Sequence, residues 1–126
     1  MGELIQKELV HKVVGCAISV LNEIGHGLRE KTYEKALTIE FKRQNLAYYQ
    51  QSKYPVYYAG ELIDEYIPDL EVEDKVIVEI KTIDTILDEH RGQLLNYLRI
   101  TKKEIGIILN FKHPRLQWER LVLTEK

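Results

Sequence analysis

A group of residues in the middle of the chain has the types and the spacing that phosphodiester chemistry requires. Pro68 and Asp69 come first, and the triplet Glu79-Ile80-Lys81 begins ten residues after the aspartate. An apolar, strand-like run leads into Glu79. Two carboxylates on neighbouring strands can hold a hard cation such as magnesium, and Lys81 projects from the same strand face as Glu79. The pattern predicts a metal-dependent phosphodiesterase, without indicating which phosphodiester it hydrolyses.

The two carboxylates must lie on one face of a hairpin for this prediction to hold. Opposed residues of an antiparallel pair have numbers with a constant sum, so if Val72 faces Val76, then Asp69 faces Glu79. A loop one residue shorter would put the aspartate on the wrong face. We therefore expect a three-residue loop, or a compensating bulge beside the proline, which cannot donate a ladder hydrogen bond.

Hydrophobic periodicity predicts the other elements that position these residues. Helices are expected over residues 4–24, 31–44 and 85–100, and strands over 54–58, 62–72, 76–82, 104–110 and 116–123. Gly25 to Gly27 end the first helical pattern, and Ala59-Gly60 forms a turn. The order of two helices, three strands, one helix and two strands predicts an α/β fold, in which a mixed sheet is flanked by helices.

Length and composition narrow the class of protein. A chain of 126 residues with 44% apolar content supports one domain over residues 1–126. It has no apolar run of about 18 residues for a membrane span. Glu3 and Glu8 argue against a signal peptide, so we expect a cytoplasmic protein without a membrane partner. Cys16, the single cysteine, lies in the apolar pattern of the first helix and is interpreted as a buried, inert thiol.

Net charge limits how the chain meets nucleic acid. At a formal charge of −2 there is no global basic field, so a phosphate-binding surface must be local, as around Lys102 and Lys103. A group of tyrosines is interpreted as strand packing and as a dimer or substrate rim, with stacking on unpaired bases as the alternative. The group comprises Tyr48, Tyr49, Tyr54, Tyr57 and Tyr58.

Two further motifs complete a resemblance to a known family. The segment from Gly27 to Tyr33 reads Gly-Leu-Arg-Glu-Lys-Thr-Tyr, a GxxExxY motif, and Gln93 and Tyr97 form a QxxxY motif. With the proline–aspartate pair and the E-x-K triplet, they resemble the PD-(D/E)XK nuclease superfamily, and within it the GxxExxY proteins and the RecB-type branch. The resemblance spans essentially the whole chain in the family order. It implies a restriction-endonuclease-like αβββαβ core.

The resemblance also implies a metal site. Asp69, Glu79 and the main-chain carbonyl of Ile80 would coordinate one Mg²⁺ or Mn²⁺ ion. Glu30 would bind the same ion through water or help to hold a second. Lys81 would position or deprotonate the attacking water and stabilise charge that develops on the phosphorane.

The remaining motif residues are assigned to orientation and substrate binding. Gln93 and Tyr97, which share one helical face, would orient the lysine and the scissile phosphate. Gly27 would let the backbone turn tightly before the helix that carries Glu30. Tyr33 is assigned to substrate contact, with packing in the helix as its alternative. The expected substrate is DNA, with RNA as the second choice, and the small surface favours a homodimer or a larger nucleic-acid-processing partner.

Other readings of the same residues stay open. Asp69 could end a strand at a turn, and Glu79 with Lys81 could form an exposed cross-strand ion pair. However, unpaired charges at the end of a central strand are costly and call for a partner or a metal. A second function is a non-cleaving nucleic-acid-binding or assembly module that retains the nuclease fold. A third is an α/β domain in which the acidic residues are structural.

Overall fold

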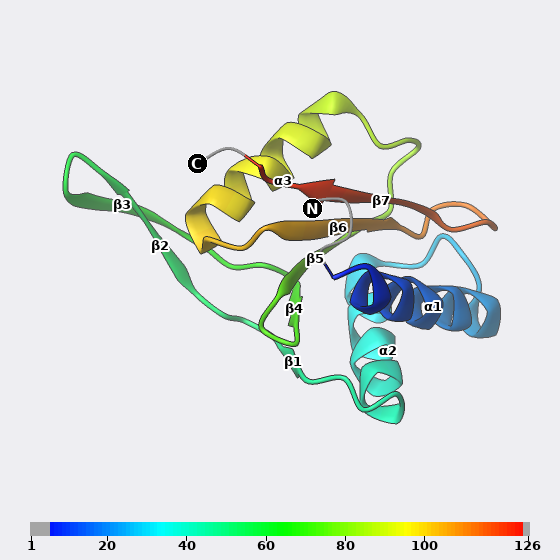
Figure 1. Ribbon diagram of the computed structural model, residues 1–126. Helices are drawn as coiled ribbons and strands as arrows, with labels where there is room; N and C mark the ends of the chain where they lie inside the picture. Colours follow the sequence, from blue (N-terminus) through cyan, green and yellow to red (C-terminus); the bar gives the residue numbers. More distant parts are fainter. Residues whose placement is uncertain (1–5, 125–126) are drawn as a thin grey trace.

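The computed structural model describes residues 6–124 and contains a mixed sheet between helices (Figure 1). The helices are α1 (Lys7–Ile24), α2 (Glu30–Arg43) and α3 (Asp88–Thr101). The strands are β1 (Tyr48–Tyr49), β2 (Tyr54–Tyr58), β3 (Glu61–Tyr66), β4 (Leu70–Val72), β5 (Val76–Lys81), β6 (Ile105–Asn110) and β7 (Gln117–Val122). Within residues 6–124, no helix has the length and apolar character that crossing a bilayer requires.

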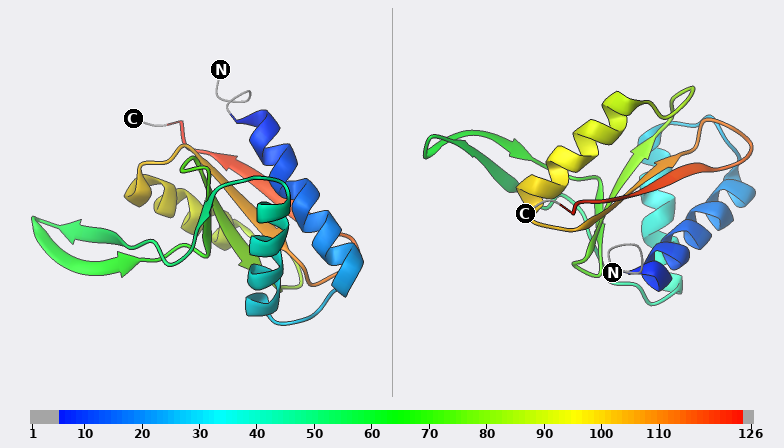
Figure 2. Two further views of the ribbon diagram at one scale, coloured as in Figure 1. Left: turned by 90° about the horizontal axis from the view of Figure 1, so that it is seen from below. Right: turned by 45° about the horizontal axis from the view of Figure 1, so that its top comes forward.

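Five strands form the main sheet in the order β1-β4-β5-β6-β7. The β5–β6 pair is parallel and the other pairs are antiparallel. A parallel pair needs a crossover connection, and α3 supplies it between β5 and β6. Helices α1 and α2 lie on one side of the sheet and α3 on the other (Figures 1 and 2). The predicted α/β class, a mixed sheet flanked by helices, is confirmed.

Side-chain alternation along β5 divides the core into two parts. Val78 and Ile80 belong to the larger apolar cluster with α1 and α2, whereas Ile77 packs in a second cluster with residues of α3. Because successive side chains on a strand point to opposite faces, Glu79 and Lys81 share the α3 side with Ile77. The strand that supplies the E-x-K triplet is therefore buried on both faces, and its polar side chains come at its end.

The hairpin of β4 and β5 has the predicted register. Val72 pairs with Val76 and Leu70 pairs with Val78. The loop has three residues, and its first two, Glu73 and Asp74, have φ of 55° and 56°. Continued to the aspartate, this register brings Asp69 to the level of Glu79.

The predicted strand over residues 62–72 is wrong in one respect, because it is two strands in two sheets. β3 pairs with β2 in a two-stranded ribbon that projects from the body, and β4 joins the main sheet (Figure 2). The break lies at Pro68, which cannot donate a ladder hydrogen bond, and at Asp69, whose Oδ2 accepts a bond of 2.8 Å from the backbone N–H of Ile80. Strand β1 was not predicted; its two residues pair with Val72 and Glu71 of β4. Residues 4 and 5 of the predicted first helix lie outside the described residues.

Candidate active site at the end of β5

Glu79 is a buried carboxyl with a defined partner. Its relative exposure is 9%, and its Oε2 accepts a short hydrogen bond from the hydroxyl of Tyr66, the last residue of β3. Burial and the neighbouring Asp69 raise the pKa of Glu79 to about 7, although the Tyr66 bond and the charge of Lys81 act in the opposite direction. At neutral pH this carboxyl is poised between its two protonation states.

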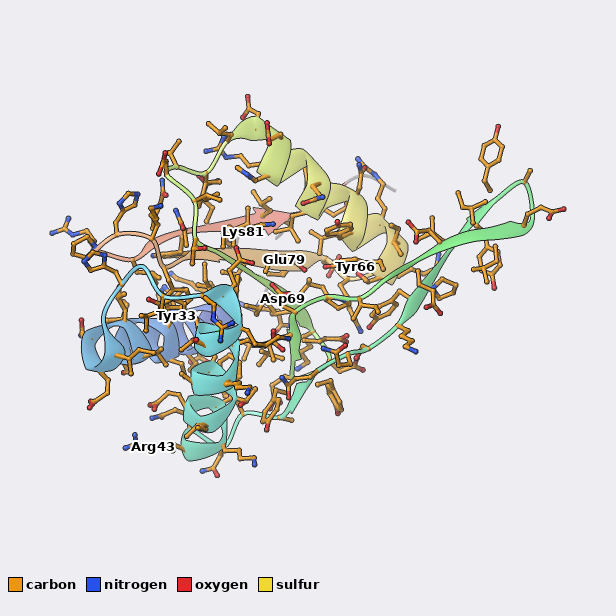
Figure 3. The ribbon with its side chains drawn as sticks, turned by 180° about the vertical axis from the view of Figure 1, so that it is seen from behind. Tyr33, Arg43, Tyr66, Asp69, Glu79 and Lys81 are labelled. Carbon is orange, nitrogen blue, oxygen red and sulfur yellow. The ribbon has the colours of Figure 1, made fainter. Side chains whose placement is uncertain are left out.

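Asp69 comes to the same place from the connection between β3 and β4. Burial raises the pKa of Asp69 above its ordinary value, partly offset by the Ile80 hydrogen bond, and the charges of Glu34 and Glu30 raise it further. The charge of Lys81 lowers the pKa of both carboxyls. Figure 3 shows Asp69, Glu79, Lys81 and Tyr66 gathered in one region. The structure therefore brings together the two acids and the lysine that the sequence singled out.

Two glutamates of α2 border this region. Glu30, the first residue of α2, accepts a hydrogen bond of 3.1 Å from the backbone N–H of Thr82, just after β5. Glu34 is 5% exposed and accepts bonds from Lys31 (3.3 Å) and Gln50 (2.8 Å). The sequence reasoning missed Glu34. Its signal was the spacing of four from Glu30, which places both carboxyls on one helical face.

Helix α3 reaches the site through stacked aromatic rings. Tyr97 stacks on Tyr66 with ring centroids 3.7 Å apart and planes inclined by 14°. Burial raises the pKa of the Tyr97 hydroxyl, and the neighbouring Gln93 side chain partly offsets that rise. Burial and the carboxylate of Glu79 raise the pKa of Tyr66, so its hydroxyl keeps its proton and acts as a donor. The predicted pair Gln93 and Tyr97 is thus linked to Glu79 through Tyr66, which stacks on Tyr97 and donates its hydroxyl to Glu79. Tyr66 itself was missed, and its place two residues before Pro68 was the only signal for it.

Gly27 and Tyr33 fix the connection between α1 and α2. Tyr33 is fully buried and stacks on Phe111 with centroids 4.2 Å apart; its hydroxyl donates to the Gly25 carbonyl (2.7 Å) and accepts from the Leu28 N–H (3.0 Å). Gly27 has φ of 80°, which favours glycine. The structure does not bring Tyr33 to the surface, and these contacts match the packing alternative rather than direct substrate contact.

The loop after β5 is fixed by a buried amide. Asn110, which pairs with Lys81 across the β5–β6 ladder, is fully buried. Its Oδ1 accepts from the Ile83 N–H (3.0 Å), and its Nδ2 donates to the Ile83 carbonyl (2.8 Å) and to Gln117 (2.8 Å). The chain just past Lys81 is therefore held in one position.

The donor chemistry at the site fits a hard divalent cation. Asp69, Glu79 and the carbonyl of Ile80 offer oxygen ligands, which Mg²⁺ and Mn²⁺ prefer. A bound cation would also offset the cost of burying two negative charges close to each other and to other acids, which raises the pKa of both carboxyls. In the part of the chain that the structure describes, no group of three or more His, Cys, Asp or Glu side chains is placed to hold an ion. The set is thus two carboxylates and one carbonyl, with Glu30 bound to the backbone of Thr82 instead.

Comparison with known proteins identifies the family. The model of the PD-(D/E)XK nuclease superfamily matches residues 7–121, so the chain belongs to that superfamily. The crystal structure of SSO0001 is similar in fold, with a TM-score of 0.60 and 17% sequence identity over 76% of this chain and 50% of that chain. This chain therefore corresponds to half the length of that protein, and the likeness shows the fold alone. No curated protein matches the sequence. Membership of the superfamily suggests nuclease activity and a nucleic-acid substrate.

Proposed function

We propose that this protein is a Mg²⁺- or Mn²⁺-dependent nuclease that hydrolyses phosphodiester bonds of DNA. The observation that carries the proposal is the meeting of Asp69, Glu79 and Lys81 at the end of β5. Two desolvated carboxyls lie there within electrostatic reach of each other and of an ammonium group. Superfamily membership supports the reaction class. RNA is the second candidate substrate.

In this proposal Asp69, Glu79 and the Ile80 carbonyl hold one divalent cation. Glu30 contributes through water or to a second ion, from its position at the start of α2. When bound, such an ion lowers the pKa of a coordinated water and neutralises charge on the phosphate. The Ile80 N–H fixes Oδ2 of Asp69 and the Tyr66 hydroxyl fixes Oε2 of Glu79, so both carboxylates are oriented before substrate arrives.

Lys81 acts on the reacting atoms in this scheme. It lies on the same face of β5 as Glu79, where its ammonium group positions the attacking water and stabilises negative charge on the phosphorane. Gln93 and Tyr97 orient the lysine and the scissile phosphate, and the stack of Tyr97 on Tyr66, with Gln93 acting on the Tyr97 hydroxyl, supports this role. Gly27 and Tyr33 complete the set by shaping the turn that leads to Glu30.

The finer classification and context are part of the same proposal. We place the chain among the GxxExxY proteins and the RecB-type branch, because both motifs stand in the order of that group. We propose one nuclease-like domain over residues 1–126, acting in the cytoplasm. Its small surface favours a homodimer or a larger nucleic-acid-processing partner for gripping a duplex.

Cleavage of a panel of labelled single-stranded, duplex and branched DNAs, with Mg²⁺ or Mn²⁺, tests the function. The Glu79→Ala and Lys81→Ala double variant should lose cleavage on every substrate. Lys75→Ala, at an exposed lysine in the loop before β5, is the matched control and should retain it. An RNA of the same sequence in the panel separates the two nucleic acids.

Two results would contradict the proposal. Cleavage that persists in the double variant would place the activity elsewhere. No cleavage by the unaltered protein, together with DNA binding that does not depend on Glu79, would favour the non-cleaving binding or assembly module.

A further inference from the structure

An apolar groove lies between the projecting ribbon and the end of α3. Its volume is about 520 Å³, within the range of small-ligand sites. Its lining comes from two elements. These are Tyr54, Pro55, Val56 and Tyr57 of β2, and Arg99, Ile100, Thr101 and Lys102 at the end of α3. The residues that line the groove include two cationic side chains and no carboxylate. Acids of β3 stand across the ribbon, among them Asp64, which pairs with Val56.

We propose that this groove binds an unpaired segment of the DNA substrate beside the cleavage site. The inference rests on the proposed nuclease function and deepens it, because it names single-stranded DNA, or a single-stranded flank of a duplex, as the substrate class. The chemistry of the groove supports this occupant. Aromatic walls stack on bases of any sequence, while nearby cations meet the backbone phosphates.

Tyr57 and Lys102 supply the two parts of that chemistry. Tyr57 is 62% exposed, so most of its ring is open to a stacking partner. Lys102 caps the C-terminal end of α3 as an exposed residue with φ of 61°, and it borders the same groove. A base on the tyrosine ring would leave its phosphate on the side of the lysine.

The groove adjoins the candidate active site through both of its walls. On the ribbon, Tyr54 of the groove is paired with Tyr66, whose hydroxyl donates to Glu79. On α3, Ile100 of the groove follows Tyr97 by three residues, or about 5 Å along the helix axis. The same two tyrosines, Tyr66 and Tyr97, are stacked on each other. A DNA strand bound at Glu79 could therefore extend directly into the groove.

The test is fluorescence anisotropy with a labelled oligothymidylate and a duplex of equal length, using the full chain in EDTA. Tyr57→Ala should weaken binding of the single strand about tenfold, the loss expected for one stacked base. Tyr58→Ala is the matched control. Tyr58 is the next residue and 74% exposed, but it does not line the groove, so its loss should change affinity less than twofold.

A charge variant tests the second part of the groove. Lys102→Asn keeps a residue that tolerates a positive φ, and it should reduce the slope of log K against log salt by about 0.7 for single strands. Lys35→Gln, at an exposed lysine of α2, should leave the slope unchanged if only the groove contacts phosphate. Urea midpoints of all four variants establish that each is folded.

Several outcomes would overturn the inference. Equal losses in Tyr57→Ala and Tyr58→Ala, or tighter binding of duplex than of single strand, would place the nucleic acid elsewhere. A change from dimer to monomer caused by Tyr57→Ala, measured by sedimentation, would assign the groove to a protein contact. Binding in EDTA is measured without cleavage, so the two proposals can fail separately. Groove binding without hydrolysis in the presence of metal would contradict only the proposed function. Hydrolysis without groove binding would contradict only this inference.

Discussion

Replacing Glu79 by glutamine is expected to stabilise the metal-free protein at alkaline pH and to leave it nearly unchanged at acid pH. The pKa of Glu79 is raised from 4.5 to about 7 in the folded protein. Between these values the unfolded chain has released the proton while the folded chain keeps it. Folding stability therefore falls as pH rises through this window and stays low above pH 7. Glutamine has no charge to release, so this loss disappears in the variant.

The size of the effect follows from the shift in pKa. A displacement from 4.5 to about 7 corresponds to roughly 3 kcal/mol at 1.36 kcal/mol per pKa unit. About 2.5 kcal/mol of this loss of folding stability falls between pH 5 and pH 8, because the rest has already occurred below pH 5 or occurs above pH 8. Glutamine keeps the shape of the side chain, and its amide oxygen can still accept from Tyr66. Asp69 is present in both proteins, so its own raised pKa largely cancels in the comparison.

Urea unfolding at pH 5 and pH 8, with EDTA throughout, measures this difference. The free energy of unfolding of Glu79→Gln, minus that of the wild type, should increase by about 2.5 kcal/mol from pH 5 to pH 8. Glu61→Gln, at an exposed glutamate on the ribbon, is the control and should show no such growth. A difference between Glu79→Gln and wild type that is the same at both pH values would refute the reasoning.

Two further substitutions test the contacts around the site. Tyr66→Phe keeps the ring but removes the bond that lowers the pKa of Glu79, so Mn²⁺ affinity at pH 7, measured by calorimetry, should fall about tenfold. Tyr54→Phe, its cross-strand partner, should leave it unchanged, and equal losses would contradict a specific role for Tyr66. Gly106→Ala should destabilise the protein by about 1–3 kcal/mol, because a Cβ there would lie 2.9 Å from Leu94 of α3. An unaltered urea midpoint would show that α3 does not pack so closely on β6.

The register of the β4–β5 hairpin could be predicted because few physical constraints decide it. Side chains alternate with a period of two, so one loop length puts Asp69 and Glu79 on one face and the next puts them on opposite faces. The sequence also indicates which face is apolar. For the same reason Lys81 could be placed beside Glu79 without knowledge of the rest of the fold.

The break near Pro68 could not be decided from the sequence. A proline in an extended run is compatible with a bulge, an edge position or a strand end. The choice depends on partners far along the chain: Asp69 takes the Ile80 N–H, and β1 covers the edge of β4. Tyr66 and Glu34 were missed for a similar reason. Periodicity shows which face a residue shares, but not which groups the fold places opposite that face.

The root of the ribbon explains why Glu79, and not the nearby Glu71, is the candidate ligand. Tyr54 and Tyr66 face each other across β2 and β3, and each donates its hydroxyl to a buried glutamate, Tyr54 to Glu71 at 2.5 Å and Tyr66 to Glu79. Glu71 already has a resident cation, since Lys103 lies 3.3 Å away. Glu79 also has a cation near it, Lys81, but burial and the second acid beside Glu79 outweigh that charge and raise its pKa to about 7. The two tyrosine–glutamate pairs therefore differ in the charges around the carboxyl. A cation from solution would stabilise the Glu79 site much more than the Glu71 site.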